Sequence, residues 1–171
     1  MKKIIILLTI LITGVAGYSY TYAASPTEKE TDLQVAVISN LQGENGRQAA
    51  VLHFTVKLNQ DQILAKDHGF VIEGIEGWKP DGHSLKQDGI YQEIDYTGNV
   101  KEGLTIAVNP SLHTSDDGYI EGKIDLIQTE GQSSEGALRA AASVSFHYRS
   151  YVNDFTITDS VSWENKSAEE S

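Results

Sequence analysis

The chain has 171 residues, among them 13 basic and 24 acidic side chains, a formal net charge of −11 and no cysteine. A strongly acidic chain is repelled by nucleic acid and by anionic membrane surfaces, so we expect neither as a partner. The lack of cysteine excludes disulfides, thiol nucleophiles and thiolate metal sites, so the fold must depend on its hydrophobic core.

The first residues predict a secretory signal peptide over 1–23. Two lysines precede an apolar stretch at 4–16, and a more polar segment then ends in small residues. Thr21 and Ala23 suit the −3 and −1 positions of a cleavage site, which predicts cleavage after Ala23, with Ala24 as the alternative. An uncleaved anchor is the other interpretation, but the stretch is shorter than the roughly 20 apolar residues that span a bilayer. We therefore expect a secreted protein that is not embedded in a membrane after cleavage.

The mature chain begins with a polar extension at 24–31 and continues into the alternating segment "TDLQVAVISN". Its period of two predicts a strand that places Leu33, Val35 and Val37 on one face. The start of a chain is usually frayed unless another element holds it. This strand therefore pairs either with its own domain or with another molecule, and the sequence leaves both open.

Period two continues through the rest of the chain and predicts an all-β fold. The other predicted strands lie at or within 52–58, 70–72, 90–96, 104–108, 120–126, 138–148 and 151–163. Turn residues occupy 42–46, 79–82, 97–99, 114–118 and 129–136. One segment, 59–69, suits a helical turn or two. This spacing is typical of an immunoglobulin-like β-sandwich of about seven or eight strands, which we assign to 32–163, followed by a polar, disordered tail at 164–171.

Residues that carry chemistry are sparse. The five histidines are scattered without a ligand-like spacing, and no strained serine turn of the hydrolase type occurs. Asp116 and Asp117 in "TSDDG" offer carboxylates around a glycine, but their spacing does not match a calcium-binding loop, and a solvated turn fits better. The sequence therefore predicts no metal, no cofactor and no enzymatic activity.

Trp78, in "IEGWKPDG", is the residue that we single out on a loop. An exposed tryptophan can stack on a sugar or anchor a partner protein. The alternative is that Trp78 folds back as a lid over one end of the sandwich.

The order of segments resembles that of fimbrial subunits of the chaperone–usher type. A polar extension and the strand "DLQVAVIS" come before a "GENG" break, and the strands "AAVLHFTVKL", "GYIEGKIDLIQTE" and "GALRAAASVSFHYRS" follow. The resemblance implies a sandwich that lacks one strand, which a chaperone and then the N-terminal strand of the next subunit supply. Leu33, Val35 and Val37 would then be the groove-filling residues of the donor strand. The implied partners are neighbouring subunits, an assembly chaperone and a host or surface ligand.

One feature departs from that family. Residues 151–163 add a strand after the expected end, and this strand could complete the sandwich within the chain. Two functions therefore compete beside a residual enzyme hypothesis: a structural or adhesive subunit of a bacterial surface fibre, and a self-contained secreted domain that binds a carbohydrate or a protein. We take the fibre subunit as the more concrete prediction.

Overall fold

The computed structural model describes residues 26–43, 46–58, 67–87, 90–108, 119–129, 138–150 and 152–165. Within these ranges the chain forms one short 3-10 turn and ten strands. They are η1 (Glu28–Glu30), β1 (Thr31–Gln42), β2 (Gln48–Leu58), β3 (Asp67–Glu73), β4 (Trp78–Gln87), β5 (Ile90–Glu93), β6 (Thr97–Asn99), β7 (Gly103–Ala107), β8 (Tyr119–Gln128), β9 (Leu138–Arg149) and β10 (Asp154–Asn165).

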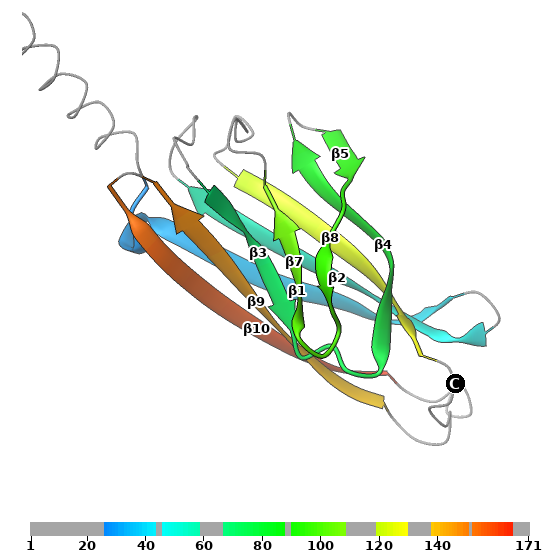
Figure 1. The fold of residues 1–171 in the computed structure, drawn as a ribbon. Helices are drawn as coiled ribbons and strands as arrows, with labels where there is room; N and C mark the ends of the chain where they lie inside the picture. The colour runs from blue at the N-terminus through cyan, green and yellow to red at the C-terminus, as the bar shows by residue number, and fades with distance from the viewer. Residues whose placement is uncertain are drawn as a thin grey trace, which may run out of the picture.

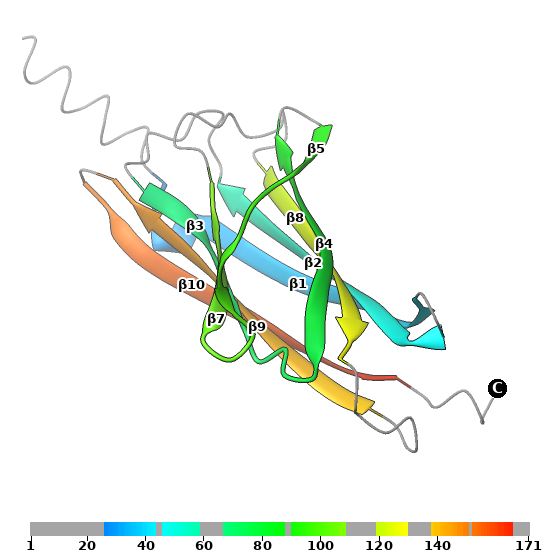
Figure 2. The same ribbon diagram turned by 45° about the vertical axis from the view of Figure 1, so that its right-hand side comes forward.

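The strands form two five-stranded sheets, with the orders β1-β2-β8-β4-β5 and β10-β9-β3-β7-β6. Neighbouring strands in the described part of the chain are antiparallel. The two sheets face each other as layers, and β1 and β10 run along the same side of the molecule (Figures 1 and 2). The predicted all-β sandwich is confirmed, and it contains more strands than the seven or eight expected.

The core lies between the two sheets because alternate residues of each strand point inward. Three phenylalanines form its centre: the ring of Phe70 lies 4.7 Å from that of Phe54 and 5.0 Å from that of Phe146, measured between centroids. All three are at most 1% exposed. Gly122 of β8 faces Phe54, and a Cβ at that position would overlap the ring. A strand glycine is thus required here by packing rather than by a turn.

The predicted turn at 79–82 is wrong, because these residues belong to β4. The pairing of β4 with β8 shifts register between Pro80 and Gly82, which marks a bulge. The neighbouring strand β5 pairs only with the segment from Ser84 onward, so Pro80 has a partner strand on one side alone. Proline tolerates bulges and strand edges, since its missing N–H breaks no hydrogen bond there.

The chain reverses a few residues earlier, between β3 and β4. The N–H of Trp78 donates to the carbonyl of Ile75 at 3.2 Å, and Gly77 at the third position of this turn has φ of 84°. A glycine adopts this backbone conformation without the strain that a Cβ would add. The turn carries the chain from one sheet to the other and places Trp78 at the first position of β4.

Several sequence predictions fall partly or wholly outside the described residues. The signal peptide at 1–23 and the turn at 114–118 lie outside them, as does most of the helical turn proposed for 59–69. The predicted turn at 97–99 is instead the short strand β6. The predicted tail at 164–171 overlaps the end of β10, which continues to Asn165.

Candidate functional site

The first strand lies at an edge of its own sheet. β1 pairs antiparallel with β2 along most of its length. Leu33 is 8% exposed, and Val35 and Val37 are partly buried against the core. The three residues predicted as a donor strand are thus brought together on the inward face of β1, in this single chain beside β2. Their partners in register are Val56, Phe54 and Leu52.

A carboxylate occupies the free edge of β1 at its middle. The backbone N–H of Val35 donates to Oδ2 of Asp159 at 2.9 Å, and Oδ1 of Asp159 accepts the N–H of Ser160 at 2.8 Å. Asp159 shares the inward face of β10 with the partly buried Ile157 and Val161. An inward-pointing charge is one of the devices by which proteins protect an edge strand from further pairing. We call the facing edges of β1 and β10, joined through Asp159, the seam.

The beginning of β1 is also bonded to the seam. The Nδ2 group of Asn153, just before β10, donates to the carbonyl of Pro26 at 2.8 Å. The hydroxyl of Thr31 donates to the carbonyl of Thr27 at 2.7 Å. Side-chain bonds of this kind fix a segment that would otherwise fray. β1 therefore pairs with β2 on one side and is bonded to Asp159 of β10 on the other, while Asn153 holds the segment before it.

Near its far end, β1 leaves the seam and carries exposed apolar residues. The register with β2 shifts between Ile38 and Leu41, where Asn40 has φ of 59°. Ile38 is 53% exposed and Leu41 is 36% exposed. The bulge places Leu41 on the same outer face as Ile38, because an extra residue reverses the alternation. Sequence reasoning missed this patch, although two apolar residues out of phase with Val35 and Val37 were its signal.

Trp78 lies in the core and not on an exposed loop. Its side chain has no exposed surface. Its ring centroid lies 5.8 Å from that of Trp163 of β10, with an angle of 54° between the rings. The indole therefore offers no face to a ligand in this structure, and the alternative of a lid over one end of the sandwich describes its position.

The histidines occupy separate environments. His68 is 2% exposed and packs against the rings of Phe146 and Tyr148, with centroid distances of 6.3 and 6.4 Å. His147, on the outer face of β9, lies with Nδ1 3.0 Å from the hydroxyl of Thr156. In the ranges that the structure describes, no three metal-ligating side chains gather at one place.

In the part of the chain that the structure describes, no helix is long and apolar enough to cross a membrane.

No protein-family model matches the chain, and no curated protein sequence matches it. Its fold resembles that of BcpA, the major pilin subunit of Bacillus cereus, with a TM-score of 0.57 and 10% identity over 80% of this chain and 40% of that one. Domains D2 and D3 of the major pilin SpaD of Corynebacterium diphtheriae give a TM-score of 0.51 and 13% identity over 77% of this chain and 51% of theirs. A 35 kDa C-terminal fragment of the major pilin GBS80 of Streptococcus agalactiae gives a TM-score of 0.50 and 10% identity over 79% of this chain and 55% of the fragment.

At sequence identities of 10% to 13%, this likeness shows a shared fold alone. The chain spans 40% to 55% of the length of those three structures. The pilin-like resemblance expected from the sequence is thus supported at the level of architecture. The chaperone–usher mode of assembly stays a prediction.

Proposed function

We propose that this protein is a non-enzymatic, exported subunit of a bacterial surface fibre, structural or adhesive, that joins its neighbours by β-strand addition. The observation that carries the proposal is the position of β1. This strand stands at an edge, follows the chain's first described residues, and fills its place between the sheets with Leu33, Val35 and Val37. It is bonded to the rest of the domain by one neighbouring strand and a few polar contacts.

This arrangement permits the exchange of β1 between two copies of the chain. If β1 of one copy replaces β1 of the next beside β2, the same backbone bonds and side-chain contacts form again, so exchange costs little free energy at equilibrium. Within one chain the effective concentration of β1 is high, which favours the closed monomer in dilute solution. High local concentration, or a chaperone that covers the edge of β2 during export, would favour the open form.

The fold comparison supports the proposal, since three solved structures of similar architecture are major pilins or parts of them. The composition of β1 supports it as well. No charged residue lies between Gln34 and Gln42, so the strand itself adds little repulsion when it pairs with β2 of another copy of this acidic protein.

The test is the size distribution of the full mature protein. We expect size-exclusion chromatography with light scattering to show a series of multiples of the monomer mass after the protein is concentrated in mild denaturant and returned to buffer. A protein that remains monomeric at every concentration under these conditions would contradict the fibre proposal and leave the self-contained binding domain.

A further inference from the structure

The end of the hairpin formed by β1 and β2 carries the most exposed large apolar side chain of the described residues. Ile38 is 53% exposed and Leu41 is 36% exposed. Between them, Ser39 and Asn40 together oppose Ala50 in a bulge, and the φ of 59° at Asn40 lies in the left-handed region. Without the extra residue, Leu41 would point toward the core side of the sheet. The bulge therefore holds a leucine in solvent.

These two side chains belong to an apolar patch on the outer face of the first sheet, because their register partners on β2 face the same way and are partly exposed. The four residues, which we call the hairpin patch, are Ile38, Leu41, Ala49 and Val51. Ile127 of β8 pairs with Ala49 and continues the patch. It is 2% exposed because the hairpin end covers it: a Cβ added to Gly43 would lie 3.0 Å from its Cδ1.

The hairpin patch lies in an uncharged part of an acidic chain. No charged residue occurs between Gln34 and Gln42 or from Gln48 to Leu52, although the net charge is −11. The nearest carboxylate in register, that of Asp125 on β8, lies 3.9 Å from Nζ of Lys123. Two copies of the chain repel each other over most of their surface, and this repulsion is weakest where they meet through the patch.

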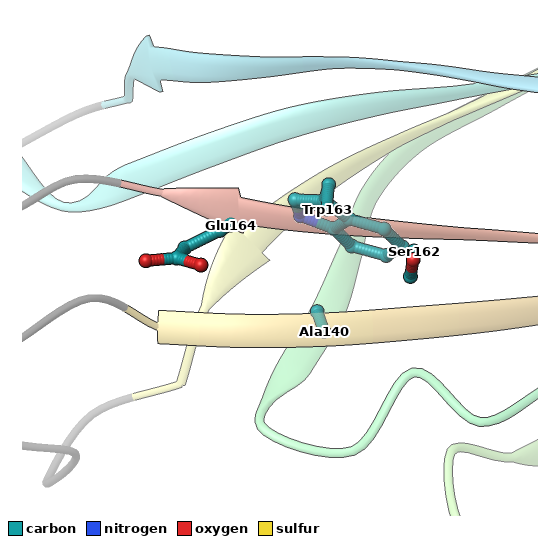
Figure 3. A pocket seen from close by; sticks show the side chains of 4 residues that line it. All are labelled: Ala140, Ser162, Trp163 and Glu164. Atoms are coloured by element: carbon teal, nitrogen blue, oxygen red, sulfur yellow. The ribbon is translucent and has the colours of Figure 1, made fainter.

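A hollow at the ends of β9 and β10 is less suitable for a partner. It has a volume of about 300 Å³ and is lined by Ala140, Ser162, Trp163 and Glu164 (Figure 3). Ser162 and Glu164 are outward residues of β10, whereas Trp163 points inward and is 7% exposed. The hollow therefore offers no accessible ring face, and its carboxylate adds to the repulsion between acidic molecules.

The size of the hairpin patch indicates which partner can use it. Four aliphatic side chains bury far less than the roughly 800 Å² per partner that is typical of a stable complex, so a single contact is weak. Weak contacts hold molecules together when many of them are repeated in one assembly. An assembly of identical copies supplies this repetition, and a twofold axis lets one patch serve both partners.

We propose that the hairpin patch is a contact between two copies of this chain, in which the patch of one copy packs on the same patch of the other about a twofold axis. The contact uses the outer face of the first sheet and leaves the seam closed. In a fibre built by strand exchange, each junction would rebuild the patch from two chains, and patches on neighbouring fibres would join them side by side. This joining rests on the proposed function, whereas the contact between two monomers does not.

A dilution series of the full mature protein, in native buffer without denaturant, tests the contact. Sedimentation velocity up to about 1 mM should show a monomer–dimer equilibrium with a dissociation constant of roughly 0.1–1 mM, as expected of a small apolar contact. The dimer should dissociate at once on dilution, whereas strand-exchanged multimers persist because they separate only by opening the domain. Raising the NaCl concentration from about 0.05 to about 0.5 M should tighten the dimer, since salt screens the repulsion between acidic copies.

NMR and variants test where the contact lies. Amide shifts that change on dilution should be confined to 38–42 and 49–51. Ile38→Thr combined with Leu41→Thr should weaken the dimer at least about tenfold, because each change removes apolar surface from both copies. Tyr96→Thr is the matched control: Tyr96 is also 36% exposed but lies beside β6 of the other sheet, so this variant should dimerise as the wild type does.

Thermal melts confirm that each variant is folded before its association is compared. The proposal is overturned if no dimer forms at about 1 mM, if added salt weakens the dimer, if the folded double variant dimerises as tightly as the wild type, or if the shifts fall outside the patch. A weak dimer without persistent multiples would support this contact and contradict the fibre. Persistent multiples without the weak dimer would do the reverse.

Discussion

The two edge strands β1 and β10 differ in how firmly they belong to the domain, although each has 12 residues and they run along the same side. β10 pairs with β9 without a register shift and buries aromatic side chains toward both ends. Phe155 stacks on Tyr148 at 5.2 Å, and Trp163 contacts Trp78 at 5.8 Å. β1 contributes aliphatic side chains, and its pairing with β2 is interrupted by a bulge.

This difference indicates which strand can be exchanged. Large aromatic side chains bury much more surface than valine, so removing β10 from the sandwich costs more free energy than removing β1. The seam therefore joins a fixed strand to a releasable one. Asp159, on the fixed strand, holds the releasable strand through a single backbone bond.

The largest expected effect comes from truncating a large side chain of the fixed strand, β10. Trp163→Ala should lower the free energy of unfolding by about 3–5 kcal/mol, as is typical for a large buried aromatic residue. Val37→Ala on β1 should cost about 1–2 kcal/mol, because the side chain is smaller and partly exposed. Urea denaturation of both variants measures the contrast. Equal losses in the two variants would remove the distinction between the strands.

A charge in the seam should have the next largest effect. Val35→Asp places a second carboxylate beside Asp159 on the inward side of β1, and we expect a loss of roughly 2–4 kcal/mol from the unpaired, partly buried charge. Ala36→Asp, on the exposed face of the same strand, is the matched control and should change stability by at most about 0.5 kcal/mol. A melting temperature of Val35→Asp equal to that of the wild type would show that β1 does not pack in its own domain in solution.

Loosening the polar bond of the seam should have the smallest effect on stability. Asp159→Ala leaves the N–H of Val35 without its acceptor, which costs about 1 kcal/mol because this part-buried edge can reach water. The same change removes a charge that protects the edge, so we expect the variant to form multimers faster than the wild type. Ser160→Ala is its control. Slower multimer formation in Asp159→Ala would mean that this carboxylate promotes pairing.

Much of the sandwich could be predicted because alternation is a local property of each strand. The segments that became β2, β8, β9 and β10 alternate apolar and polar residues along most of their length. β4 was missed because "WKPDGHSLKQ" contains a proline and a glycine, and because just two of its side chains described by the structure, Trp78 and Leu85, are fully buried. Its membership in the sheet depends on pairing with β8, which is distant in sequence.

The candidate sites were predicted less completely, because they also depend on contacts between residues that are distant in sequence. The apolar face of β1 follows from its own pattern, whereas the role of Asp159 depends on a bond to a residue 124 positions earlier. The sequence shows a carboxylate between Ile157 and Val161, but it does not show which N–H donates a hydrogen bond to it. Trp163 was recognised as part of the last strand, but its contact with Trp78 joins opposite sheets.

The central claim, that β1 pairs with β2 within one chain and can pair in the same register between chains, can be tested by a disulfide. Ala36 and His53 are register partners on the outer face of the first sheet, at a spacing that a disulfide can bridge. The chain has no cysteine of its own, so Ala36→Cys with His53→Cys introduces the only pair. Ala36→Cys with Thr55→Cys, which is out of register, is the control.

The measurement is non-reducing electrophoresis after oxidation. We expect one internally linked monomer band when the double variant is oxidised in dilute solution, and a covalent ladder when it is oxidised after concentration in mild denaturant. The out-of-register pair should give much less of both. A monomer band alone under every condition would contradict strand exchange between subunits.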